Sequence, residues 1–177
     1  MSGQDGTTTV AEVAVELADA DATRAYGAAL AGLLRPGDLV VLTGDLGAGK
    51  TTLTQGIGQG LHVRGAVASP TFVIARVHPP LPRDDGTTGP ALVHVDAYRL
   101  GSLDEVDALD LDASLDESVT VVEWGAGLVE SLAADRLEVA LRRPRGAVAD
   151  AEDAAAGVRT VTVRAHGDRW HGVPLPG

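Results

Sequence analysis

The segment at residues 44–52 constrains the fold more than any other part of the chain. It reads GDLGAGKTT and fits the pattern G-x-x-x-x-G-K-[ST] in full. Residues 39–42, LVVL, are wholly apolar and indicate a buried parallel strand before it, and residues 49–60 are expected to form a helix after it. A buried strand, a glycine-rich loop and a helix in this order predict a phosphate-binding loop in an α/β domain.

This loop is expected to bind phosphate through its backbone and through a few side chains. Its glycines allow a tight turn that aims backbone N–H groups at phosphate oxygens. Lys50 should reach the β- and γ-phosphates of a nucleotide, and the Thr51 hydroxyl should ligate magnesium. The predicted nucleotide-binding residues of the loop are Asp45, Leu46, Gly47, Ala48, Gly49, Lys50, Thr51 and Thr52.

The composition supports this role for Lys50. Among 14 Lys and Arg residues it is the only lysine, so every other such cation in the chain is Arg. An ammonium is a compact point charge, whereas a guanidinium is a wide planar fork that would not fit inside a closed phosphate loop. The net charge of −11 argues against direct, tight binding to nucleic acid. The absence of Cys excludes disulfides and thiol catalysis.

The rest of the pattern predicts alternating strands and helices. Strands are expected at 10–17, 71–77, 91–95, 119–123, 136–142 and 158–164, and further helices at about 19–34, 102–109 and 128–132. The first helix should bury an apolar face made of Ala22, Tyr26, Ala29, Leu30 and Leu33. Strands 71–77 and 91–95 could pair antiparallel across the Pro- and Gly-rich loop at 78–90. A second biased loop lies at 144–157.

We therefore predict a single α/β P-loop NTPase-like domain with a mostly parallel central sheet, added antiparallel strands and helices on both faces. Residues 1–9 are expected to be disordered, 10–166 to form the domain, and 167–177 to be a C-terminal tail whose Trp170 anchors either to the core or to a partner. No apolar stretch approaches the ~20 residues of a membrane-spanning helix. The start of the chain lacks an apolar signal core. The expected location is the cytoplasm, with no membrane association.

Two acidic residues end apolar strands. Asp96 ends ALVHVD, and Glu123 ends VTVVE. In a phosphate-loop fold the carboxyl ends of such strands lie near the phosphates, so either acid could hold magnesium or orient the attacking water. His94 precedes Asp96 on the same strand and is interpreted as a core residue, or as one that supports the site from behind, rather than as a catalytic residue.

The motifs that are absent limit which nucleotide the loop is expected to bind. The guanine-reading motif N-K-x-D is missing, and no D-x-x-G follows the loop. The L-S-G-G-Q signature of ABC-type ATPases is absent as well. The sequence therefore favours ATP, bound together with Mg²⁺.

Four segments together resemble the TsaE family, the ATPase of bacterial tRNA threonylcarbamoyladenosine synthesis. They are residues 44–52, Ser69-Pro70-Thr71-Phe72, residues 94–100 (HVDAYRL) and Glu123-Trp124. The resemblance implies a catalytic set of Lys50, Thr52, Asp96 and Glu123, and a magnesium set of Thr51, Asp96 and Glu123. It also implies nucleotide contacts at Thr71 in a γ-phosphate-sensing segment, at Trp124 beside the site or a partner, at 19–23, and near Arg159.

The resemblance further implies protein partners. Members of this family work with TsaB and TsaD, and TsaD transfers the threonylcarbamoyl group to an adenosine next to the anticodon. Hydrolysis of ATP is expected to drive or reset that complex, with tRNA reached only indirectly, through the partners. Two alternatives stay open on the sequence: a small-molecule kinase that uses the same phosphate loop, and a non-hydrolysing ATP sensor.

Overall fold

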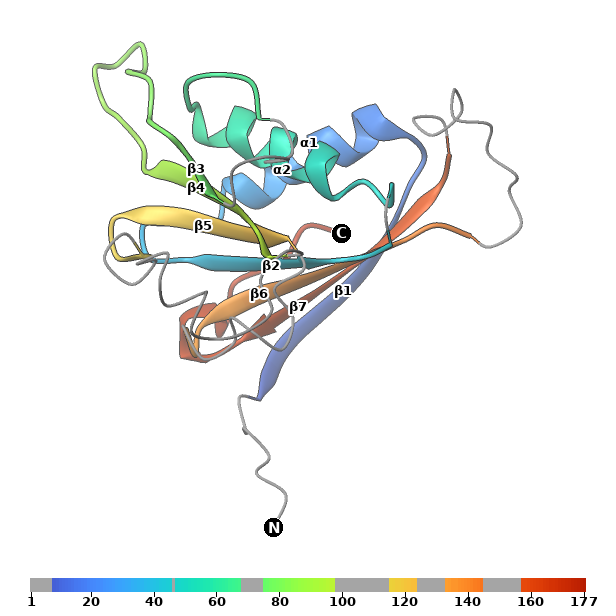
Figure 1. The fold of residues 1–177 in the computed structure, drawn as a ribbon. Helices are drawn as coiled ribbons and strands as arrows, with labels where there is room; N and C mark the ends of the chain where they lie inside the picture. The colour runs from blue at the N-terminus through green and yellow to red at the C-terminus, as the bar shows by residue number, and fades with distance from the viewer. Residues whose placement is uncertain (1–7, 46, 68–74, 98–114, 124–132, 145–156) are drawn as a thin grey trace.

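The described residues of the computed structural model form one α/β sheet with two α-helices packed on it (Figure 1). The structure describes residues 8–45, 47–67, 75–97, 115–123, 133–144 and 157–177. The sheet has seven strands in the order β1-β7-β6-β2-β5-β4-β3. Their bounds are β1 Thr9–Leu17, β2 Leu39–Thr43, β3 Ala75–His78, β4 Ala91–Asp96, β5 Ser118–Glu123, β6 Arg136–Arg142 and β7 Arg159–His166.

The centre of the sheet is parallel and its margins are antiparallel. Strand β2 pairs parallel with β5 and β6, and β5 pairs parallel with β4. Strand β7 runs antiparallel between β1 and β6, and β3 pairs antiparallel with β4, as the sequence predicted for the strands on either side of 78–90. The predicted fold class, a single α/β domain with a mostly parallel central sheet and added antiparallel strands, is therefore confirmed. Of the helices predicted on both faces, the described ones lie on one face. The helices expected at 102–109 and 128–132 lie outside the described residues.

Helices α1 (Ala20–Ala31) and α2 (Lys50–Leu61) lie side by side on one face of the sheet (Figure 1). Their backbones approach closely because glycines occupy the contact: a methyl group on Gly56 would lie 2.8 Å from the Cα of Arg24. The predicted apolar face of α1 was wrong at one position, since Ala29 is exposed. Gly27 is buried there because α1 packs against the backbone of α2, and Thr23 is buried where it meets Arg159.

Both faces of the central strands are buried. Val40 and Leu42 of β2 join the large core cluster on the helix side, and Leu39 and Val41 join a smaller cluster on the opposite side. This two-sided burial explains why the sequence of β2 is apolar throughout instead of alternating. Among the described residues, no helix is long and apolar enough to cross a membrane.

The C-terminal residues pack against the domain. The 3-10 helix η4 (Asp168–Trp170) buries Trp170, which is 1% exposed and belongs to the main core cluster. The Arg169 guanidinium lies 4.2 Å from the centre of the Trp170 ring, and the Tyr26 hydroxyl donates to the Pro176 carbonyl at 2.8 Å. Of the two positions left open for Trp170, the structure shows the core.

Candidate phosphate-binding site

The predicted phosphate loop connects β2 to α2. Gly49, the residue before α2, has φ +109, and Gly47 has φ +78, so both adopt backbone conformations that favour glycine. Asp45 and Gly47 are exposed, and Ala48 is buried. Leu46 lies outside the described residues. The loop thus leads directly from a buried strand to the N-terminus of a helix, where backbone N–H groups and the helix dipole favour an anion.

Lys50 is the first residue of α2, and its side chain folds back into the loop. The residue is 6% exposed, and its Nζ donates to the Gly44 carbonyl at 2.7 Å and the Asp45 carbonyl at 3.0 Å. Burial lowers the pKa of the Lys50 ammonium, while the negative charges of Glu123, Asp45 and Asp96 act in the opposite direction. The ammonium is therefore held inside the loop, with carboxylates close enough to influence it.

Two acids and a threonine meet beside Lys50 at the carboxyl edge of the parallel strands. Asp96 and Glu123 are register partners on β4 and β5, which places them next to each other. Glu123 is 2% exposed and Asp96 is partly buried. The Thr51 hydroxyl donates to Oε1 of Glu123 at 3.4 Å, and the buried His94 Nε2 lies 3.0 Å from the same oxygen.

This group of oxygens suits magnesium. Mg²⁺ is usually bound by one or two carboxylates together with waters and substrate phosphates, rather than by a closed protein cage. Thr51, Asp96 and Glu123 supply oxygen ligands of that kind, and no set of three or more His, Asp or Glu among the described residues could hold a metal by itself. The residues present therefore fit a magnesium ion that is shared with a bound phosphate. Thr52 follows on α2 and is partly buried.

A second group of predicted residues reaches the other side of the loop. Arg159, the first residue of β7, is 2% exposed and lies so close to the loop that a methyl group on Gly49 would be 3.0 Å from its Nη1. The same Nη1 donates to the Thr23 hydroxyl at 3.3 Å. Asp19 caps α1 by accepting from the Ala22 N–H at 2.8 Å. The fold thus brings Arg159 and the start of α1 to the phosphate loop, whereas Thr71 and Trp124 lie outside the described residues.

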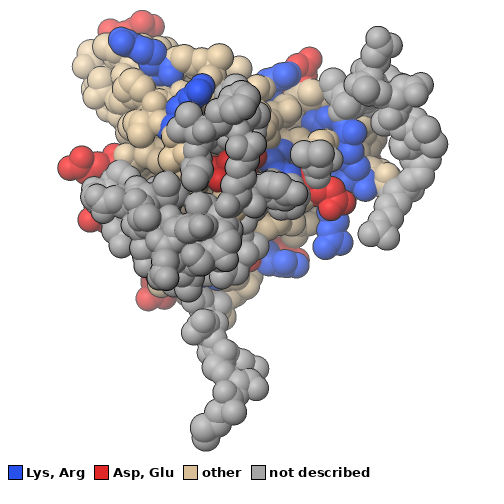
Figure 2. Space-filling view, in the orientation of Figure 1, with Lys and Arg blue, Asp and Glu red and all other residues tan. Residues whose placement is uncertain are grey.

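Positive charge gathers at this side of the site. Burial lowers the pKa of Arg159, and repulsion from Arg143 and Arg24 lowers it further, while Asp19 opposes the shift. Figure 2 shows one group of Lys and Arg side chains near the point where β6 ends and β7 begins, and others spread over the rest of this face. In a chain of net charge −11, this local group of cations favours an anionic ligand where the protein as a whole repels one.

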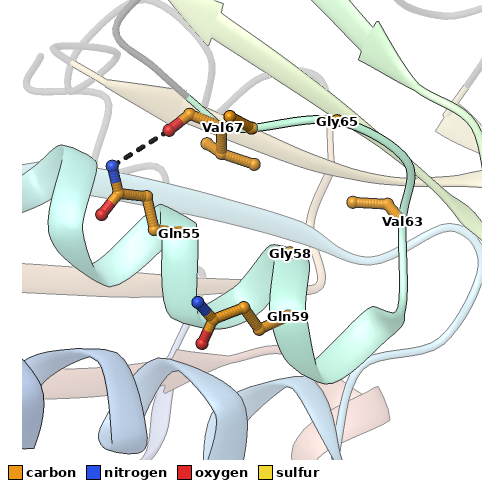
Figure 3. A pocket seen from close by; sticks show the side chains of 7 residues that line it. Gln55, Gly58, Gln59, Val63, Gly65 and Val67 are labelled. Atoms are coloured by element: carbon orange, nitrogen blue, oxygen red, sulfur yellow. Dashed lines mark hydrogen bonds between the residues drawn. The ribbon is translucent and has the colours of Figure 1, made fainter.

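A small pocket lies between the C-terminal half of α2 and the segment that follows it. It has a volume of about 190 Å³ and is lined by Gln55, Gly58, Gln59, Val63, Gly65, Ala66 and Val67 (Figure 3). The Gln55 side chain donates to the Val67 carbonyl at 3.0 Å (Figure 3). This bond joins α2 to Val67, the last described residue before the segment that carries Thr71.

Sequence reasoning left the role of His94 undecided between the core and support of the site. The structure shows both, because His94 is 0% exposed and also contacts Glu123. Part of this role could have been predicted from the sequence of β4, because side chains alternate along a strand and His94 and Asp96 must lie on the same face. The contact itself depends on the register between β4 and β5.

The fold and the loop define a single α/β domain of the P-loop NTPase-like class. Comparison with known proteins narrows this class. A family model described as threonylcarbamoyl adenosine biosynthesis protein TsaE matches residues 17–149. The chain therefore belongs to the TsaE family.

Individual relatives agree with this assignment. The chain is 61% identical over 148 residues to the tRNA threonylcarbamoyladenosine biosynthesis protein TsaE of Streptomyces coelicolor, an alignment that covers 83% of this chain and 93% of that protein. The protein of the same name from Bacillus subtilis is 38% identical over 122 residues, with 68% and 72% covered. The crystal structure of YdiB from Bacillus subtilis superposes with a TM-score of 0.64 at 29% identity and covers 92% of this chain and 91% of that one.

Proposed function

We propose that this protein binds Mg-ATP in the loop around Lys50 and hydrolyses it, and that hydrolysis drives or resets a complex of TsaB and TsaD homologues during tRNA threonylcarbamoyladenosine formation. The observation that carries the proposal is the arrangement of Lys50, Thr51 and Glu123 at one edge of the sheet. Membership of the TsaE family supports the role in this biosynthesis.

Each residue has a defined task in this proposal. Lys50 neutralises charge on the β- and γ-phosphates. Its ammonium gives up the hydrogen bonds to the Gly44 and Asp45 carbonyls and donates to phosphate oxygens instead. Thr51 together with Asp96 or Glu123 would hold magnesium, which when bound would withdraw charge from the phosphate oxygens. Whichever of the two carboxylates is not engaged by the metal is positioned to orient the attacking water. Arg159 and Thr23 contact the nucleotide from the opposite side of the loop.

The partners are expected to complete the site. Phosphoryl transfer is fast when a second cation neutralises the γ-phosphate, a contribution worth about 10³–10⁵ in kcat in P-loop enzymes. Arg159 lies beside Gly49, but its strand β7 and the strands that carry Asp96 and Glu123 lie on opposite sides of β2 in the sheet. We therefore propose weak hydrolysis by the isolated protein and faster hydrolysis in the complex. The net charge of −11 favours contact with tRNA only through the partners.

Titration calorimetry tests the binding step. Mg-ATP should bind to the wild-type protein, and Lys50→Ala and Lys50→Arg should both lose most of that binding, the second because a guanidinium does not fit inside the loop. Thermal denaturation of both variants, compared with wild type, controls for folding. Full retention of affinity in Lys50→Ala would contradict the proposed site. Transfer of phosphate to a small acceptor would indicate a kinase, and binding without phosphate release even with partners would indicate a sensor.

A further inference from the structure

His94 is a buried polar residue at the back of the proposed site. Its side chain is 0% exposed, and its Nε2 lies 3.0 Å from Oε1 of Glu123, whose side chain is 3% exposed. The neighbours of His94 on β4, Val93 and Val95, belong to the apolar core on the other face of the sheet. A buried carboxylate needs hydrogen bonds to offset the loss of water, and His94 and Thr51 both supply one to Oε1.

The chemistry of the pair fixes which ring nitrogen carries hydrogen. An ionised carboxylate only accepts hydrogen bonds, so Nε2 of His94 must be the donor. The other ring nitrogen, Nδ1, is buried and has no hydrogen-bond partner among the described residues. Hydrogen on Nε2 leaves only a lone pair unmatched at Nδ1, whereas hydrogen on Nδ1 would leave a buried N–H donor unsatisfied. The surroundings therefore select one tautomer, which aims a single donor at Glu123.

This donor does not serve packing alone. On the helix side of the sheet the neighbouring strand residues, Leu92 and Val121, are apolar and buried, and a leucine at position 94 would match them without introducing ring nitrogens. The donor is instead directed at one of the two acids beside Lys50. In metal and phosphate sites, residues behind the ligands commonly fix the orientation of those ligands.

We propose that His94 is a positioning residue that holds the Glu123 carboxylate with Oε1 facing Thr51. This proposal rests on the proposed function. With Oε1 fixed, the Thr51 hydroxyl donates its hydrogen to Glu123 and keeps its oxygen lone pairs for magnesium. The second oxygen of Glu123 then has a defined direction toward the water or the metal. Loss of the His94 donor would free the carboxylate to rotate and would disturb both residues at once.

Two substitutions separate positioning from packing. His94→Leu fills a similar space without a donor, and His94→Gln places an amide N–H near the position of Nε2. Phosphate release from Mg-ATP is measured for both in the presence of the TsaB–TsaD homologues, with thermal stability measured alongside. We expect His94→Leu to lower kcat by about 10- to 100-fold, the usual size for residues that support metal ligands, with a smaller change in KM for ATP. His94→Gln should recover a substantial part of kcat although its polar side chain makes it the less stable variant.

A purely structural role would give the opposite order. If His94→Leu were as active as His94→Gln, or if activity followed thermal stability in both, the positioning role would be overturned. A double-mutant cycle tests the same point independently. In a Glu123→Gln background, where the carboxylate is already gone, His94→Leu should cause little further loss of kcat. An equally large loss in both backgrounds would show that His94 acts independently of Glu123.

A spectroscopic measurement keeps this inference separate from the proposed function. Nitrogen-15 NMR of the imidazole should show hydrogen on Nε2, and Glu123→Gln should shift that signal while Glu12→Gln, a substitution of an exposed acid on β1, should not. Hydrogen on Nδ1, or no response to Glu123→Gln, would overturn the role of His94 whatever the activity. Absence of phosphate release from the wild-type protein with its partners would instead overturn the proposed function, and the NMR result would still decide the role of His94.

Discussion

Substituting Gly56 by Ala should destabilise the protein through the contact between α1 and α2. A methyl group at this position would lie 2.8 Å from both the Cα and the carbonyl carbon of Arg24, and closer still to its carbonyl oxygen. Favourable carbon–carbon contacts lie at about 3.5–4.0 Å, so the methyl group is too close by roughly 0.7 Å. Because the opposing atoms belong to the backbone, no rotamer change can make room, and the helices must separate.

The expected size follows from two opposing effects. Overpacking of this kind costs about 1–3 kcal/mol, and a rigid backbone neighbour favours the upper end. Replacing Gly by Ala inside a helix by itself stabilises the folded state by about 1 kcal/mol. We therefore expect a net loss of about 1–2 kcal/mol in the free energy of unfolding, which corresponds to roughly 2–8 °C in Tm for a chain of this size.

Gly58→Ala is the matched control on the same helix. Its nearest neighbour would be a methyl group of Val67 at 2.9 Å, and side chains can move where a backbone cannot. The stability that Gly58→Ala loses through this contact should be largely offset by the higher helix propensity of Ala. Urea denaturation followed by circular dichroism measures both variants. If Gly56→Ala lost no more stability than Gly58→Ala, the close-packing argument would be wrong. Since α2 also carries Lys50, Gly56→Ala should weaken Mg-ATP binding as well.

Three further predictions concern the loop, the metal and the response to pH. Gly49→Ala places a methyl group 3.0 Å from Nη1 of Arg159 at a backbone φ of +109, and should weaken Mg-ATP binding at least ~10-fold in calorimetry, about 1.4 kcal/mol; an unaltered affinity would contradict the loop geometry. Thr51→Ala should lose the magnesium dependence of ATP binding while Thr51→Ser keeps it, and equal behaviour of the two in a magnesium titration would refute the hydroxyl's role. Burial raises the pKa of Tyr26 to about 12, so its contribution to stability is complete below pH ~10 and is lost as pH rises toward the folded-state pKa. The free energy of unfolding of Tyr26→Phe should therefore decrease less than that of the wild type between pH 9 and 11. Above pH ~10 the two slopes should differ by about 1.4 kcal/mol per pH unit. Identical slopes would show that Tyr26 has the same pKa in the folded and unfolded states.

Local features of the site could be predicted from the sequence because they depend on neighbours in the chain. The spacing within residues 44–52, together with the apolar strand before it, was sufficient to predict a glycine-rich turn between a buried strand and the helix that begins at Lys50. Asp96 and Glu123 could be placed at the same edge of the sheet because each ends an apolar strand in a parallel arrangement.

The remaining features depend on contacts between distant segments. Arg159 reaches Gly49 because β7 inserts antiparallel beside β6, and no spacing in the sequence reveals that strand order; the family resemblance implied only that a nucleotide contact lies near Arg159. The bond from His94 to Glu123 requires the register between β4 and β5. Ala29 was misplaced because the helical period identifies an apolar face but not whether a sheet or the backbone of another helix will cover it.

Phosphate release from Mg-ATP, measured for the purified protein alone and with its own organism's TsaB and TsaD homologues, decides whether this protein is a partner-stimulated ATPase. We expect slow release by the isolated protein and clear stimulation by the partners, with both abolished in Lys50→Ala. Equal release with and without the partners would contradict the link to that complex, and release that survives in Lys50→Ala would contradict the site itself.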